Sequence, residues 1–141
     1  MAYIRLVHPR EFDHDKGRFS DLAFKNSSDG GMSVFEQACA ERASGGVICV
    51  HSRDYYASVT GEPPVFYIIG ELELPEGATL KETLSDTGDE CHREVENVSN
   101  KKLYKTFKNR RSFELFYTCE NNTVRPVTTD DVAKWKLLYG E

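Results

Sequence analysis

The stretch Gly17–Val34, GRFSDLAFKNSSDGGMSV, decides how this chain is organised. It is rich in Ser, Asp, Asn and Gly, which are typical turn residues, yet it contains the apolar block Leu22-Ala23-Phe24. That combination predicts a loop whose backbone is pinned to the protein body while small polar groups face outward. A ligand-binding loop has this composition, and so does an ordinary long turn.

The loop is bounded by two expected elements. Before it, residues 2–7, AYIRLV, have the β-branched and aromatic character of a strand, and Pro9 ends it. After it, Ser33-x-x-Glu36 has the form of a capping box and predicts a helix that ends at Gly45-Gly46. Residues 11–31 show no regular periodicity, and loops of this length are usually functional or disordered. The apolar block favours order.

The rest of the chain alternates between expected strands and helices. Thr79-x-x-Glu82 is a second candidate capping box. We expect strands over 47–50, 65–74, 112–119 and 124–127, and helices over 53–59, about 88–99 and from Thr128 or Thr129 onward. These elements predict an α+β fold: one compact domain over 1–141, with a mixed, mostly antiparallel sheet of about four to six strands and three or four helices.

Length and composition fit a globular protein. The chain has 141 residues, of which 39% are hydrophobic and 29% charged. It contains no apolar run of about 18 residues, and its polar first residues do not resemble a secretory signal. We therefore expect a cytoplasmic protein with no membrane association.

The cysteines and histidines show no metal-binding spacing. The four cysteines are Cys39, Cys49, Cys91 and Cys119. They form no CxxC pair, so we expect buried free thiols, no disulfide and no metal. A nucleophile built from Cys49, His51 and Asp54 is disfavoured because Cys49 lies inside an apolar run.

Two carboxylates stand out near the end of the strongest expected strand. In VFYIIGELEL (65–74), Leu72 and Leu74 alternate with Glu71 and Glu73, which predicts one apolar and one polar face. The glutamates either line the solvated face of the strand or belong to a site.

A family resemblance supports the second interpretation. Arginine on a first strand, a serine-bearing segment (Ser27-Ser28 to Ser33) and a glutamate on a late strand resemble the pattern of ADP-ribosyltransferases. The opening also resembles RES-domain toxins, through R-x-x-H-P at Arg5–Pro9 and A-F-x-x-S at Ala23–Ser27. The resemblance covers roughly the first 35 residues and one strand.

The resemblance implies an NAD-using ADP-ribosyltransferase-like protein or an NAD-degrading, toxin-like protein, with NAD as cofactor and an antitoxin-like protein as a partner. Glu71 or Glu73 would be catalytic, because a carboxylate stabilises the positive charge that develops on ribose. Arg5, or His8, would bind phosphate, and Ser27 or Ser28 would orient the nicotinamide. The alternative for Arg5 is an arginine that faces solvent on an edge strand. Convergence of these residues on one cleft would favour the enzyme hypothesis.

A basic segment supports a different function. KKLYKTFKNRR (101–111) contains no acidic residue and six basic ones: Lys101, Lys102, Lys105, Lys108, Arg110 and Arg111. Without these six charges the net charge of −5 would be −11. The segment either contacts nucleic acid or an acidic protein partner as a non-enzymatic binding module, or is simply solvated. Its apolar residues Leu103 and Phe107 would anchor it in the core.

Overall fold

A computed structural model describes residues 2–13, 15–26, 30–43, 67–87, 89–108, 115–118 and 124–140. The strands are β1 (Tyr3–Val7), β2 (Phe12–Asp13), β3 (Arg18–Phe19), β4 (Met32–Glu36), β5 (Tyr67–Leu72), β6 (Thr79–Glu82), β7 (His92–Glu96), β8 (Leu115–Thr118) and β9 (Val124–Pro126). The helices are η1 (Pro9–Glu11), η2 (Asp21–Ala23), α1 (Gln37–Ala43), α3 (Leu84–Thr87), α4 (Asn100–Phe107) and α5 (Thr129–Tyr139).

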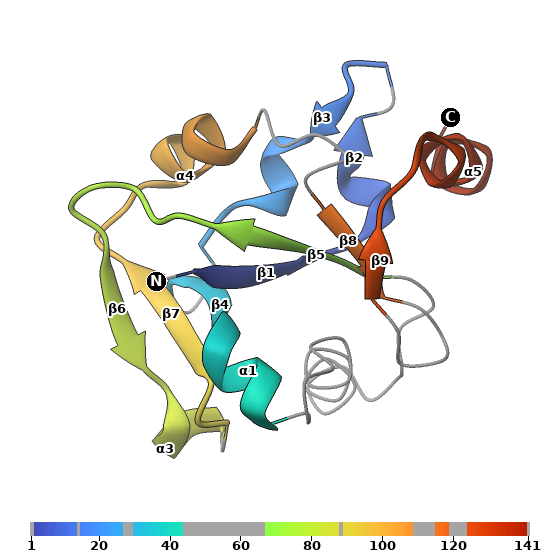
Figure 1. The fold of residues 1–141 in the computed structure, drawn as a ribbon. Coiled ribbons are helices and arrows are strands. Elements are labelled where there is room, and N and C mark those ends of the chain that lie inside the picture. Colours follow the sequence, from blue (N-terminus) through green and yellow to red (C-terminus); the bar gives the residue numbers. More distant parts are fainter. Residues whose placement is uncertain are drawn as a thin grey trace.

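Seven of the strands form one antiparallel sheet in the order β6-β7-β4-β1-β5-β8-β9, and β2 pairs with β3 in a small hairpin. The expected α+β class is therefore confirmed, with a sheet one strand larger than anticipated. β1 is the middle strand, between β4 and β5 (Figure 1). No helix in the described part of the chain is long and apolar enough to cross a bilayer.

The main core lies on one face of the sheet. There the β2–β3 hairpin, η2, α4 and α5 cover the strands, while α1 lies on the other side (Figure 1). Phe19 and Phe24 meet edge to face with ring centroids 5.7 Å apart, and Trp135 of α5 approaches Phe12 at 6.3 Å. Burying these large aromatic side chains supplies much of the hydrophobic stabilisation. Trp135 thereby docks α5 on the core.

One glycine permits a close approach between strands. Gly31 precedes β4, and a Cβ placed there would collide with the carbonyl oxygen of Val95 on β7. Glycine alone lacks this atom, so it allows the loop to enter the sheet directly beside β7.

One expected helix begins later than predicted, and a second is a strand in the structure. Ser33 and Glu36 belong to β4, so they form no capping box, and a helix begins only at Gln37. Residues 92–96 form β7 rather than part of a helix over 88–99. Thr79 and Glu82, the second candidate capping box, bound the edge strand β6. In each case pairing with a neighbouring strand outweighs a local helical signal. The strand expected over 47–50 and the helix over 53–59 lie outside the described residues.

Candidate functional site

Arg5 lies on the central strand and is turned toward the main core. Its Nε donates to the carbonyl oxygen of Ala23 at 3.2 Å, and its Nη1 donates to that of Ser33 at 2.9 Å. Burial lowers the pKa of Arg5, and the nearby Glu11 carboxylate opposes this shift. The sequence-based prediction that Arg5 faces solvent on an edge strand is therefore wrong. Arg5 instead ties the apolar block, through Ala23, and the start of β4, through Ser33, to β1.

His8 and Glu11 form the turn that follows β1. His8 caps η1: its Nδ1 accepts from the backbone N–H of Arg10 at 3.1 Å, and its backbone N–H donates to Glu11 Oε1 at 3.4 Å. The His8 ring also packs edge to face on Tyr139 of α5. Burial lowers the pKa of His8, with a smaller contribution from Arg10, and burial raises the pKa of Glu11. These contacts give His8 a structural role at the junction of η1 and α5.

The residues of the expected NAD site are not brought together by the described structure. Glu71 pairs directly with Ile4, so it shares the face of Ile4, and Arg5 points to the opposite face. The side chains of Glu71 and Glu73 are exposed. Ser27 and Ser28 lie outside the described residues. Arg5 and Glu71 thus do not share the cleft that the transferase hypothesis requires.

The described part of the loop that carries the apolar block, residues 17–26 and 30–34, is held by three kinds of contact. Ala23 and Phe24 are buried in the main core. Asn26 donates through Nδ2 to the carbonyl oxygen of Val98 at 2.9 Å, and its backbone N–H donates to Asn100 Oδ1 at 2.8 Å. Together with the Arg5 hydrogen bonds, these contacts hold the described part of the loop to β1 at Ala23 and Ser33 and to the start of α4 at Asn26.

Helix α4 and the following residue, Lys108, carry the described part of the basic segment, residues 101–108. Leu103 and Phe107 are buried, and Phe107 packs against Phe24 at 5.3 Å between ring centroids. This confirms the anchors expected from the sequence. Ser99 caps the helix by accepting from the backbone N–H of Lys102 at 3.2 Å. The packing fixes which side of α4 faces solvent.

We call that solvent side of α4 the lysine face. It consists of the exposed Lys101, Lys102 and Lys105 and the partly exposed Lys108. Lys102 Nζ donates to the carbonyl oxygen of Glu76 at 2.9 Å, which holds one ammonium group in place. No salt bridge within the described part of the chain joins these lysines to a carboxylate. Arg110 and Arg111 lie outside the described residues.

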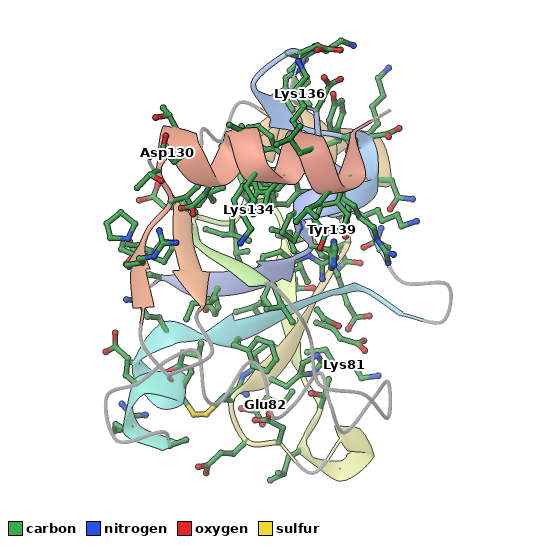
Figure 2. All side chains as sticks on the ribbon, turned by 90° about the vertical axis from the view of Figure 1, so that its right-hand side faces the viewer. Lys81, Glu82, Asp130, Lys134, Lys136 and Tyr139 are labelled. Carbon is green, nitrogen blue, oxygen red and sulfur yellow. A yellow bond between two sulfur atoms is a disulfide. The ribbon has the colours of Figure 1, made fainter. Side chains whose placement is uncertain are left out.

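A disulfide joins Cys39 and Cys91, with their Cα atoms 5.4 Å apart (Figure 2). The expectation of free thiols is therefore wrong for these two cysteines. The two cysteines are 52 residues apart in the sequence, so their proximity could not be predicted without knowing the register of the paired strands. Phe35 pairs with His92, so Glu36 lies opposite Cys91, and α1 then carries Cys39 back over that position. Cys49, His51, Asp54 and Cys119 lie outside the described residues.

Sequence reasoning also missed a cluster around this disulfide. The ligand atoms of Cys39, Glu90 and Cys91 all lie within 4.8 Å of one another. Glu90 and Cys91 are adjacent in the sequence and could have been noted as possible metal ligands. The third residue of the cluster, Cys39 on α1, could be assigned only once the pairing of β4 with β7 was known.

Comparison with known proteins adds no family to this geometry. No family model matches the chain, and no curated protein or solved structure matches it either.

Proposed function

We propose that this chain is a non-enzymatic binding module that contacts the phosphate backbone of nucleic acid through the lysine face of α4. The observation that supports this function is the division of α4 into two sides. Leu103 and Phe107 point into the core, and the lysines therefore face solvent with no acidic residue among them. A rigid, single-sign surface on a chain of net charge −5 concentrates attraction for a polyanion at one place.

The spacing of the lysines fits a phosphate backbone. Lys101, Lys105 and Lys108 recur at helical spacing along one side of α4, over a rise of about 10 Å. Successive phosphates of one DNA strand advance about 3.4 Å along the duplex axis, so the three ammonium groups match about three steps. The partly buried Tyr104 lies in the same helix, where an aromatic ring adds a stacking surface for an unpaired base.

The transferase hypothesis stays a prediction, and the placement of Arg5 and Glu71 gives it no support. An acidic protein partner is the competing ligand for the lysine face, because it offers the same charge. An acidic protein lacks the regular repeat of phosphates. The salt dependence of the affinity, and competition between an oligonucleotide and an acidic polypeptide for the chain, therefore distinguish the two ligands.

The test is binding to a fluorescent single-stranded and a double-stranded oligonucleotide across salt concentrations. With about four lysine–phosphate contacts, the slope of log K against log salt is about −3.6 on duplex DNA, which weakens binding about 10²-fold between 50 and 200 mM salt. The double variant Lys101→Glu/Lys105→Glu loses most of the affinity and flattens the slope by about 2.

The matched control is Lys81→Glu/Lys136→Glu, which changes the net charge equally. Lys81 is on β6 and Lys136 is on α5 (Figure 2). Lys136 pairs with Asp15 at 3.8 Å, and both side chains are exposed, so its loss costs little. Equal losses in both variants, or binding only to an acidic polypeptide, would overturn the proposal.

A further inference from the structure

The disulfide lies where α1 meets the start of β7. The backbone N–H of Glu36 donates to the carbonyl oxygen of Cys91 at 3.0 Å, which extends the β4–β7 pairing to this point. The chain turns into α1 at Gln37, and Cys39 therefore lies in the first turn of the helix. The two sulfur atoms and a carboxylate oxygen of Glu90 lie within 4.8 Å of one another.

The turn that carries Glu90 and Cys91 is held by side chains on both sides. Asp89 Oδ1 accepts from the backbone N–H of Cys91 at 2.8 Å. Arg93 Nη1 donates to the carbonyl oxygen of Glu90 at 2.5 Å and to that of His92 at 2.9 Å. These hydrogen bonds fix the backbone independently of the disulfide, so the positions of Glu90 and Cys91 do not depend on the S–S bond alone.

The Glu90 side chain is exposed and open to a ligand. Its carboxylate has no hydrogen bond or ion pair to any other residue within the described ranges, where Arg93 contacts only its carbonyl oxygen. Cys39 is partly exposed and Cys91 is buried. An ion can therefore approach from the Glu90 side while one sulfur stays shielded from water.

We propose that reduction of this disulfide creates a binding site for a zinc-class divalent cation, with Cys39, Cys91 and Glu90 as ligands. Two thiolates and a carboxylate are ligands that Zn²⁺ accepts, and a water molecule completes a four-coordinate site. Zinc at about 2.3 Å from each of two sulfurs holds them about 3.8 Å apart, against about 2 Å in a disulfide. The sulfurs therefore need to separate by less than about 2 Å on reduction and metal binding.

The two states exclude each other chemically. A dithiol or phosphine reductant supplies two electrons, and with two protons the S–S bond becomes two thiols. Zinc then displaces both thiol protons as it binds the sulfurs. A small-molecule disulfide oxidant takes up two electrons from the two thiolates by thiol–disulfide exchange and is itself reduced to two thiols, which re-forms the S–S bond and releases the ion. The site thus responds to the redox state of its surroundings, and it is independent of the lysine face.

The experiment uses the full chain, reduced with a phosphine and freed of metal, titrated with Zn²⁺ against a chromogenic chelator. We expect one zinc per reduced chain, with release of about two protons at a pH where the thiols are protonated, and none in the oxidised chain. Replacing zinc with Co²⁺ should produce thiolate-to-cobalt charge-transfer absorption. Reduced wild-type chain without zinc binding or without this absorption overturns the proposal.

Variants identify the ligands. Glu90→Gln should weaken zinc binding at least about tenfold, whereas the control Glu82→Gln, at an exposed position on β6, should not change it. Cys39→Ser should abolish binding, and Cys49→Ser/Cys119→Ser should retain it. Circular dichroism checks that each variant is folded. Unchanged affinity in Glu90→Gln or in folded Cys39→Ser contradicts the ligand assignment.

Discussion

Arg5 shows at the scale of one residue what the sequence could and could not reveal. A charge inside an apolar strand indicates a special role, and the sequence suggested a phosphate ligand or an exposed position. The actual acceptors are carbonyl oxygens 18 and 28 residues away. Every residue has a backbone carbonyl group, so the residue types do not show which carbonyl oxygens will accept from Arg5. The central position of β1 depends on which strands pair with it. Neither could be predicted from the pattern.

Replacing Arg5 should therefore affect folding before any ligand. Arg5→Met keeps the size of the side chain but leaves two carbonyl oxygens without their donor, which should lower the free energy of unfolding by about 2–4 kcal/mol. Urea unfolding measures this loss. Arg10→Met, at an exposed site, should change stability by less than about 0.5 kcal/mol. If Arg5→Met lowered the free energy of unfolding as little as the control does, the role of Arg5 in holding Ala23 and Ser33 to β1 would be contradicted.

At the scale of elements, strong apolar alternation was a reliable guide and short helical signals were not. Strands β1, β5 and β8 and helix α5 lie within or close to their expected ranges. Helix α5 presents Trp135 to the core, whereas Leu138 is 53% exposed. Segment 91–98 shows the opposite case: three apolar residues at helical spacing are outweighed by backbone pairing of β7 with both β4 and β6. The sheet neighbours, absent from the local pattern, decide the outcome.

The start of α5 predicts a pH dependence of stability. Arg125 donates to both carboxylate oxygens of Asp131, at 2.6 and 2.8 Å, and Thr128 completes a capping box. The hydrogen bond from Arg125, followed by those from Thr128, lowers the pKa of Asp131 from 3.8 to about 2. A carboxylate with a lowered pKa in the folded state stabilises the fold above the unfolded-state pKa, and this contribution disappears as the pH falls from about 4 to 2.

Asp131→Asn should therefore lower the free energy of unfolding at neutral pH by about 1 kcal/mol, a value reduced for the solvent exposure of Arg125. The difference from wild type should shrink to near zero at about pH 2. Urea unfolding at several pH values measures both effects. Asp130→Asn is the matched control because Asp130 is exposed on the same turn (Figure 2). A pH-independent difference for Asp131→Asn would contradict the role of its charge.

At the scale of the whole molecule, the disulfide closes a long stretch of chain. It links residues 52 positions apart, and a cross-link restricts the unfolded chain more as the enclosed loop lengthens. The fold class followed from the order of strands and helices. The disulfide could not be predicted from that order, because it depends on strand register and on where α1 begins.

Reduction of the disulfide in the absence of metal should lower the free energy of unfolding by about 2–4 kcal/mol. Chemical denaturation with and without a phosphine reductant measures the change. The variant Cys39→Ala/Cys91→Ala should match the reduced wild type and show no response to reductant. Equal stability of reduced and oxidised wild type would contradict a stabilising cross-link.

The central position of β1 has a consequence for synthesis on the ribosome. β1 ends at Val7 and its neighbour β5 begins at Tyr67, so about 60 residues must be translated before that partner exists. At about 5–20 residues per second this delay is about 3–12 s. Its other neighbour, β4 (Met32–Glu36), is translated earlier, so after that point one backbone edge of β1 stays unpaired in the growing chain until β5 exists. Nascent-chain aggregation and chaperone capture should therefore concentrate on this first strand.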